Sequence, residues 1–226
     1  MEWQGQCKTT ILAGQNMGNP GRYRLIALAA VVAAGLVAVG TWHRQANGAG
    51  EPRSGWRPIS GNWTIHSNVV SNAHYGRGDM MIVDRPGGSD YRISADVRFD
   101  LLFAETHYGD AGLIIRTTDP QPGVDSYTGY YAGLRPDSQT VVLGRASYEW
   151  RQLEETKLAT PLPAGQWYHL ELAARGCELE VIARPVDGRP GTQLHYQDPD
   201  CLTTGVGGLR SFYADASWRN VKISTW

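Results

Sequence analysis

Charge is scarce in this chain, and neither sign is in excess. The 226 residues include 21 basic and 22 acidic side chains, which give a formal net charge of −1. Domains that bind nucleic acid usually present a basic patch or a strongly basic surface. The balanced charge therefore excludes nucleic acid from the expected partners.

Several short catalytic strings are also missing. The sequence contains no His-Glu-x-x-His motif for a zinc hydrolase, no Cys-x-x-Cys pair and no Gly-x-Ser-x-Gly nucleophile turn. Zinc-hydrolase and serine-hydrolase chemistry therefore lack support. No catalytic residue is assigned from the sequence, and no cofactor is expected.

Helical periodicity is absent after residue 43, whereas residues typical of strands and turns are abundant. The chain has 27 Gly, 8 Trp and 11 Tyr, a composition typical of an all-β domain with many turns. Residues 91–99 alternate between apolar and polar side chains, as expected of a half-buried antiparallel strand. Similar strand candidates recur along the chain with turn residues between them. The pattern predicts an all-β domain over residues 58–226, built as a two-sheet antiparallel jelly-roll sandwich.

One long hydrophobic run precedes this domain. Residues 25–42 contain no charge, and a helix of that length spans about 27 Å, close to the hydrocarbon core of a bilayer. We expect a transmembrane anchor at 25–42, after a short tail at 1–24 and before a linker at 43–57. A cleaved signal peptide is the alternative. The expected location is the cell membrane, with a single span and an extracytoplasmic C-terminal domain, or secretion if the segment is cleaved.

Cysteine is rare, and two of the three cysteines support export. Cys177 and Cys201 flank two strand candidates joined by turn residues at 187–191. If this hairpin is centred on residue 189, residue 177 faces residue 201, close enough for a disulfide. A disulfide is expected outside the cytosol. Two buried free thiols are the alternative.

The order of motifs resembles a known superfamily. Residues 112–116 (GLIIR), 165–170 (GQWYHL) and 207–223 (GGLRSFYADASWRNVKI) are similar to the concanavalin A-like lectin/glucanase superfamily. Within it the chain looks closest to levan-binding-type carbohydrate-binding modules and the 3-keto-disaccharide hydrolase domain. The resemblance implies two curved antiparallel sheets with ligands on the concave face or its rim. The string E-x-D-x-x-E, which would place a glucanase's carboxylates on one strand face, is absent.

The strands at 112–116 and 130–135 supply the candidate ligand-binding residues. If Leu113 and Leu134 face the core, then Arg116, Tyr131 and Arg135 share the opposite face. Aromatic faces and charged donors of this kind bind sugars. A patch that only covers the sheet or pairs with acidic side chains is the alternative. The predicted ligand-binding set is Arg116, Tyr131, Arg135, Arg145, Tyr148 and Trp150.

Aspartates in loop-like contexts leave a structural calcium as an open alternative, because calcium takes oxygen ligands from such loops. They have no compact spacing, so no metal ligands are assigned. These residues are Asp119, Asp125, Asp198, Asp200 and Asp215.

Together the patterns favour a membrane-anchored, extracytoplasmic carbohydrate-recognition domain without catalytic activity, whose partner is a glycan or polysaccharide. Two alternatives remain. One is a glycoside hydrolase of the same superfamily, and the other is a sandwich used for protein contact or sensing.

Overall fold

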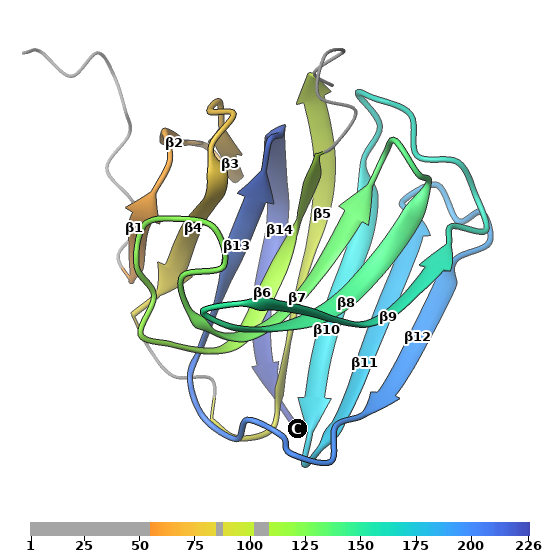
Figure 1. The fold of residues 1–226 in the computed structure, drawn as a ribbon. Helices are drawn as coiled ribbons and strands as arrows, with labels where there is room; N and C mark the ends of the chain where they lie inside the picture. Colours follow the sequence, from red (N-terminus) through yellow and green to blue (C-terminus); the bar gives the residue numbers. More distant parts are fainter. Residues whose placement is uncertain (1–54, 85–87, 102–108) are drawn as a thin grey trace, which may run out of the picture. The chain divides into compact units, whose positions relative to one another are not determined.

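The computed structural model describes residues 55–84, 88–101 and 109–226. The predicted tail and anchor lie outside these residues, as does most of the predicted linker. Within the described ranges no helix is long and apolar enough to cross a bilayer. Two sheets stacked face to face form the domain (Figure 1).

The first sheet, sheet A, contains seven strands. In spatial order these are β1 (Trp56–Ser60), β4 (Arg77–Val83), β13 (Val206–Phe212), β6 (Asp110–Thr118), β7 (Thr128–Arg135), β8 (Thr140–Ser147) and β9 (Trp150–Lys157). The first strand begins two residues before the expected start of the domain.

The second sheet, sheet B, also contains seven strands. In spatial order these are β12 (Thr192–Gln197), β11 (Glu178–Pro185), β10 (Tyr168–Arg175), β5 (Tyr91–Leu101), β14 (Asp215–Thr225), β3 (Val69–Asn72) and β2 (Trp63–His66). The pairings in both sheets are antiparallel. The predicted two-sheet antiparallel sandwich is therefore confirmed.

The core lies between the two sheets and follows the alternation of the strands. The apolar side chains of β5 from Tyr91 to Phe99 are fully buried, whereas the polar side chains of Arg92, Ser94 and Arg98 are not. Leu113 and Leu134 of sheet A face the same core. The pleat of each strand thus carries one face inward and leaves the other for separate use.

Sheet A is buried on its outer face as well. Met80, Ile114 and Tyr131 belong to a second apolar cluster that is separate from the core between the sheets. The β6–β7 loop packs over this region, since a Cβ on Gly78 would meet the Gly123 carbonyl oxygen at 2.8 Å. This covered patch borders the open part of the face, where the candidate site lies.

Candidate functional site

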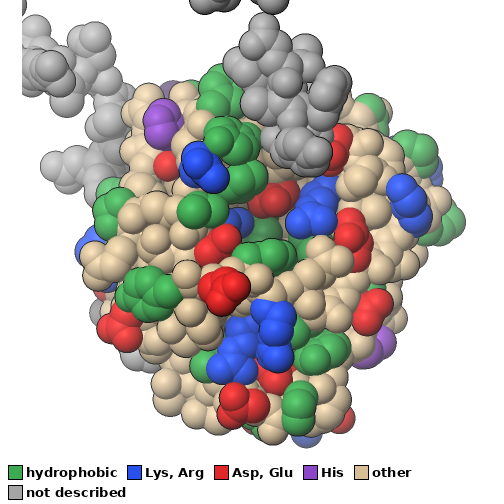
Figure 2. Space-filling model, in the orientation of Figure 1, with side chains coloured by type: hydrophobic (Ala, Val, Ile, Leu, Met, Phe, Trp, Pro, Cys, Tyr) green, Lys and Arg blue, Asp and Glu red, His purple; other side chains and the backbone are tan. Residues whose placement is uncertain are grey.

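The outer face of sheet A is hollowed, with acidic and basic side chains gathered around apolar ones (Figure 2). Three neighbouring strands build it. Phe212 of β13 pairs with Asp110 of β6, and Tyr131 and Arg135 of β7 lie beside them. We call this hollow the sheet A groove. One part of it is a cavity of about 140 Å³ lined by Asp110, Val124, Asp125, Tyr131, Arg135, Trp150, Arg210 and Phe212.

Glycines allow two aromatic rings to lie down on this face. A Cβ on Gly133 would lie 2.5 Å from the Tyr131 hydroxyl oxygen, and a Cβ on Gly144 would overlap the Trp150 indole. With no side chain at either position, the two rings lie along the sheet and meet edge to face, with centroids 6.0 Å apart. The rings form an apolar surface of defined shape at the groove.

Arg210 is the buried cation of the groove, and only 4% of its side chain is exposed. Its Nη2 lies 2.8 Å from the Asp125 carboxylate, and its Nη1 lies 3.5 Å from that of Asp110. The guanidinium carbon lies 4.7 Å from the centre of the Tyr131 ring. Two carboxylates and an aromatic face together offset the cost of burying this charge.

The line of charge continues along the groove through Arg135. Its Nε lies 3.9 Å from the Asp110 carboxylate, and its Nη1 lies 3.2 Å from that of Glu155. The Thr140 hydroxyl donates to Glu155 at 2.6 Å. Acids and bases therefore alternate from Asp125 to Glu155 along the groove.

Burial sets the acid–base behaviour of the groove. It raises the pKa of Asp110, although Arg210, the Tyr131 hydroxyl and Arg135 act in the opposite direction. Burial also raises the pKa of Tyr131, whose hydroxyl donates to Asp110 at 2.6 Å. The Thr140 hydroxyl and Arg135 together lower the pKa of Glu155 despite partial burial. Burial thus favours the protonated form of Asp110, whereas the partners of Glu155 favour its charged form.

A second cavity extends the groove toward the β7–β8 turn. It measures about 350 Å³ and is lined by Gly109, Asp110, Arg135, Asp137, Ser138, Glu155 and Phe212. The two cavities share Asp110, Arg135 and Phe212. They therefore form one continuous groove with aromatic and charged walls.

The structure brings three of the six predicted ligand-binding residues together in the groove: Tyr131, Arg135 and Trp150. Arg145 and Trp150 line a neighbouring cavity of about 420 Å³, with Ser147, Glu149, Arg151 and Asp200. Tyr148 is exposed and lines neither cavity, and its hydroxyl donates to the Asp119 carbonyl.

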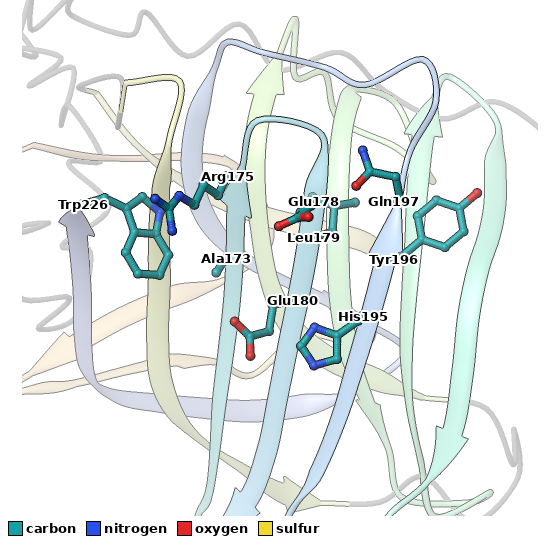
Figure 3. A pocket seen from close by; sticks show the side chains of 9 residues that line it. All are labelled: Ala173, Arg175, Glu178, Leu179, Glu180, His195, Tyr196, Gln197 and Trp226. Carbon is teal, nitrogen blue, oxygen red and sulfur yellow. The ribbon is translucent and has the colours of Figure 1, made fainter.

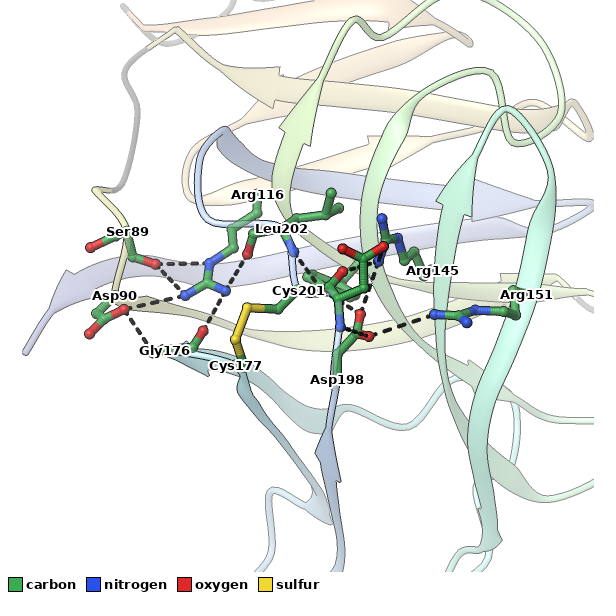
Figure 4. Close-up of a disulfide and its surroundings, with 12 residues drawn as sticks. Ser89, Asp90, Arg116, Arg145, Arg151, Gly176, Cys177, Asp198, Cys201 and Leu202 are labelled. Atoms are coloured by element: carbon green, nitrogen blue, oxygen red, sulfur yellow. Dashed lines mark hydrogen bonds and ion pairs between the residues drawn. A yellow bond between two sulfur atoms is a disulfide. The ribbon is translucent and has the colours of Figure 1, made fainter.

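The prediction that Arg116 shares a face with Tyr131 and Arg135 is wrong. Arg116 has φ of 51°, at a point where the β6–β7 register shifts, so the strand no longer alternates there. Its buried guanidinium donates to the carbonyl oxygens of Ser89, Gly176 and Leu202 (Figure 4). It joins three chain segments and does not reach the groove.

The predicted disulfide between Cys177 and Cys201 is confirmed, with a Cα–Cα distance of 5.2 Å. The predicted register is not. Glu178 pairs with Gln197, so residue 177 faces residue 198. A turn after β12 then brings residue 201 back to its partner.

Hydrogen bonds to the buried side chain of Asp198 hold the turn after β12 in place. Asp198 is fully buried and accepts from the Tyr130 hydroxyl at 2.7 Å and from Arg145 at 3.2 Å. Burial acts to raise the pKa of Asp198, but the Tyr130 hydroxyl, the Asp200 N–H and Arg145 outweigh it, so the pKa is lowered. Arg145 is therefore tied to this turn, next to the disulfide.

Sequence reasoning missed Arg210, Asp110 and Phe212. Arg210 is the one charged residue of strand β13, whose other residues are apolar or small, and that isolation is the signal that could have marked it. Asp110 and Phe212 offered no such signal.

No three of the five loop aspartates, all of which lie in the described part of the chain, gather at one place. Asp125 pairs with Arg210, and Asp198 is enclosed by Tyr130 and Arg145. Among the described residues, no three His, Cys, Asp or Glu side chains gather to hold a metal ion.

Solved structures share this architecture. The carbohydrate-binding module CBM66 from Bacillus subtilis has a TM-score of 0.62 and 21% identity, covering 76% of this chain and 96% of that chain. A galectin-like protein of unknown function from the same organism has a TM-score of 0.59 and 13% identity, covering 75% and 89%. The Ca²⁺- and Man2-bound exoplasmic/lumenal domain of VIP36 has a TM-score of 0.59 and 15% identity, covering 76% and 81%.

These likenesses show the fold that defines the class: the domain is a two-sheet antiparallel β-sandwich of the kind found in these three structures. Residues 41–224 match the family described as the 3-keto-alpha-glucoside-1,2-lyase-like domain. Because that match spans most of the chain, the protein belongs to this family. No curated protein sequence matches the chain.

Proposed function

We propose that the domain binds carbohydrate in the sheet A groove and does not turn it over. The observation that carries the proposal is the pairing of aromatic walls with a line of alternating charges. Trp150 and Phe212 offer apolar surface for the C–H faces of a sugar. Carboxylates and guanidinium groups beside them match sugar hydroxyls as acceptors and donors. The fold shared with CBM66 and the mannose-bound VIP36 domain supports this proposal.

The charge of the groove narrows the ligand class. Its lining contains four acids, Asp110, Asp125, Asp137 and Glu155, and two bases, Arg135 and Arg210. An excess of acids repels sulfated glycans and uronates, since like charges within a few ångströms cost free energy. The ligand is therefore a neutral saccharide or an amino sugar.

The location is part of the proposal. We place the domain at the outer face of a membrane, tethered by residues 25–42. The disulfide supports an oxidising compartment. Alkaline extraction of membranes and protease treatment of intact cells test the tether and its orientation. Release of the full chain by alkali would contradict the anchor.

A glycan array with the full chain, purified in a detergent without a sugar headgroup, tests the binding. We expect retention of neutral glycans, and a loss of at least about tenfold in affinity for Trp150→Ala, because the stacking surface disappears. Arg189→Ala is the matched control, since Arg189 is exposed and pairs locally with Asp187. Equal binding by the Trp150 variant and the control would contradict the site.

A lyase is the second candidate function, favoured by the family and by the Tyr131–Asp110 pair in the groove. In such a reaction Asp110 takes the C2 proton of a 3-keto glucoside. The C1–O bond breaks, a C1=C2 double bond forms, and an acid protonates the departing oxygen. A 3-keto disaccharide tests this through the ultraviolet absorbance of the unsaturated ketone. Formation of that product by the wild type, lost in Asp110→Asn, would favour the lyase over binding alone.

A further inference from the structure

The outer face of sheet B carries a second hollow, of about 370 Å³, over β10, β11 and β12 (Figure 3). We call it the sheet B hollow. It is lined by Ala173, Arg175, Glu178, Leu179, Glu180, His195, Tyr196, Gln197 and Trp226. None of these residues belongs to the sheet A groove, which lies on the other side of the sandwich.

The strand register explains the depth of this hollow. Ala173, Glu180 and His195 lie in one row across the three strands. Ala173 contributes only a methyl group, so the sheet surface is low between its taller neighbours. Figure 3 shows Trp226 on one side of this low point, and Glu180 and His195 on the other.

Trp226 forms an aromatic wall held by cations. The guanidinium carbon of Arg92 lies 4.4 Å from the indole centre, and that of Arg175 lies 5.7 Å away. The Nη1 group of Arg92 in turn donates to the Oε1 atom of Glu171 at 3.2 Å, which holds the Arg92 side chain in place. Yet 56% of Trp226 remains exposed. An indole that is positioned but still open to solvent is suited to stack on a ligand.

The opposite wall offers unused hydrogen-bonding groups. Within the described part of the chain, the side chains of Glu178, His195 and Gln197 make no hydrogen bond, whereas Glu180 accepts from Gln193. Acceptors and donors around a shallow apolar floor match the alternating hydroxyls and C–H faces of a sugar. The lining is too polar for an apolar protein segment.

We propose that the sheet B hollow is a second carbohydrate site for a neutral saccharide. Occupied together with the groove, it makes the domain bivalent, with sites on opposite faces. One domain can then engage two chains of a polysaccharide, and avidity follows without further contacts. The proposal goes beyond the groove, since the two sites share no residue.

Counting sites per chain tests the proposal. The probes are soluble levan, amylopectin and yeast mannan, followed by titration with a short oligosaccharide of whichever is retained. The full chain is used in a detergent without a sugar headgroup. We expect two sites per chain for the wild type, and one for Trp226→Ala. Ala173→Leu fills the hollow without removing a polar group and should also leave one site.

Trp150→Ala separates this proposal from the groove. We expect it to retain the hollow as its one remaining site, and the Trp150/Trp226 double variant to lose binding. If Trp150→Ala abolishes all binding, the second site is wrong and the groove stands. If Trp226→Ala abolishes all binding and Trp150→Ala changes nothing, the hollow stands and the groove fails. A wild type that retains none of the three polysaccharides overturns both.

Discussion

Arg116 and Arg210 are both buried in central strands of sheet A, but their surroundings differ. Arg116 is held chiefly by neutral backbone carbonyl oxygens from three chain segments. Arg210 is held by two carboxylates and lies over an aromatic ring, and its Nε has no hydrogen-bond partner among the described residues. The donors of Arg116 are thus bonded to the protein's own backbone. Arg210, in contrast, lines a cavity, so its charge and those of its two carboxylate partners lie where a ligand can bind.

This difference separates stability from recognition. Backbone carbonyls cannot change protonation or move without unfolding the segments that carry them. Carboxylates can take up a proton or turn toward water or a ligand. We therefore expect substitution at Arg116 to affect mainly folding, and substitution at Arg210 to affect mainly binding.

The largest expected effect is that of Arg116→Met. It leaves three carbonyl oxygens without their donor and should lower the free energy of unfolding by about 3–5 kcal/mol. Urea denaturation of the full chain measures it. Arg116→Lys should recover only part of the loss, because one ammonium cannot replace a planar fork of donors. A Met variant as stable as the wild type would remove the distinction between the two arginines.

Loss of the disulfide should cause the second-largest decrease in the free energy of unfolding. Cys177→Ser with Cys201→Ser opens a link of sequence separation 24, and we expect a loss of about 2–4 kcal/mol. The same region is affected, since Arg116 donates to the carbonyls of Gly176 and Leu202, the neighbours of the two cysteines. Wild-type protein treated with dithiothreitol should show the same urea midpoint as the double variant. Glycan affinity should change little in the folded protein.

Arg210→Met should affect glycan binding more than stability, the opposite of what we expect for Arg116→Met. Its cost in stability is expected to be smaller, about 1–2 kcal/mol, because Asp110 can take up a proton and Asp125, whose side chain is 16% exposed, can turn toward water once the cation is gone. Glycan affinity should fall at least about tenfold, since Asp110 and Asp125 lose the charge that positions them. Titration with the retained oligosaccharide measures this. Unchanged affinity in a folded variant would place the ligand elsewhere on the domain.

The sequence predicted the fold well, because alternation is a local property. Tyr91, Ile93 and Val97 point to the core as their spacing requires. The site was predicted less well, because its geometry depends on distant contacts. The kink that turns Arg116 away interrupts the β6–β7 register, and no residue type near it signals a bulge. The pair of Arg210 and Asp125 joins residues 85 positions apart.

The cysteines show a prediction that was right for an incorrect reason. The hairpin between β11 and β12 pairs residue 178 with residue 197, which a centre at residue 189 does not allow. The disulfide forms because the turn after β12 is held by buried Asp198. A buried carboxylate bonded to Tyr130, on the other sheet, cannot be inferred from local spacing.

The smallest expected effect is on the pH dependence of the free energy of unfolding, to which Asp198 beside the disulfide and Asp110 in the groove should contribute with opposite signs. The pKa of Asp198, beside the disulfide, is lowered. Its contribution to stability is therefore complete above the ordinary aspartate pKa and is lost as the pH falls through the lowered value. The pKa of Asp110, in the groove, is raised. The folded state then binds more protons than the unfolded state, so stability decreases as the pH rises above the ordinary value.

Asp198→Asn and Asp110→Asn isolate these contributions. We expect the wild type to lose stability relative to Asp198→Asn only as the pH falls below the ordinary aspartate pKa, and relative to Asp110→Asn only as the pH rises above it. Urea midpoints of the three proteins between about pH 2.5 and about pH 7 measure both slopes. Slopes of the same sign would mean that the groove holds its carboxylate as tightly as the turn beside the disulfide does. The groove would then be a closed structural network, and Asp110 would not be free to meet a ligand.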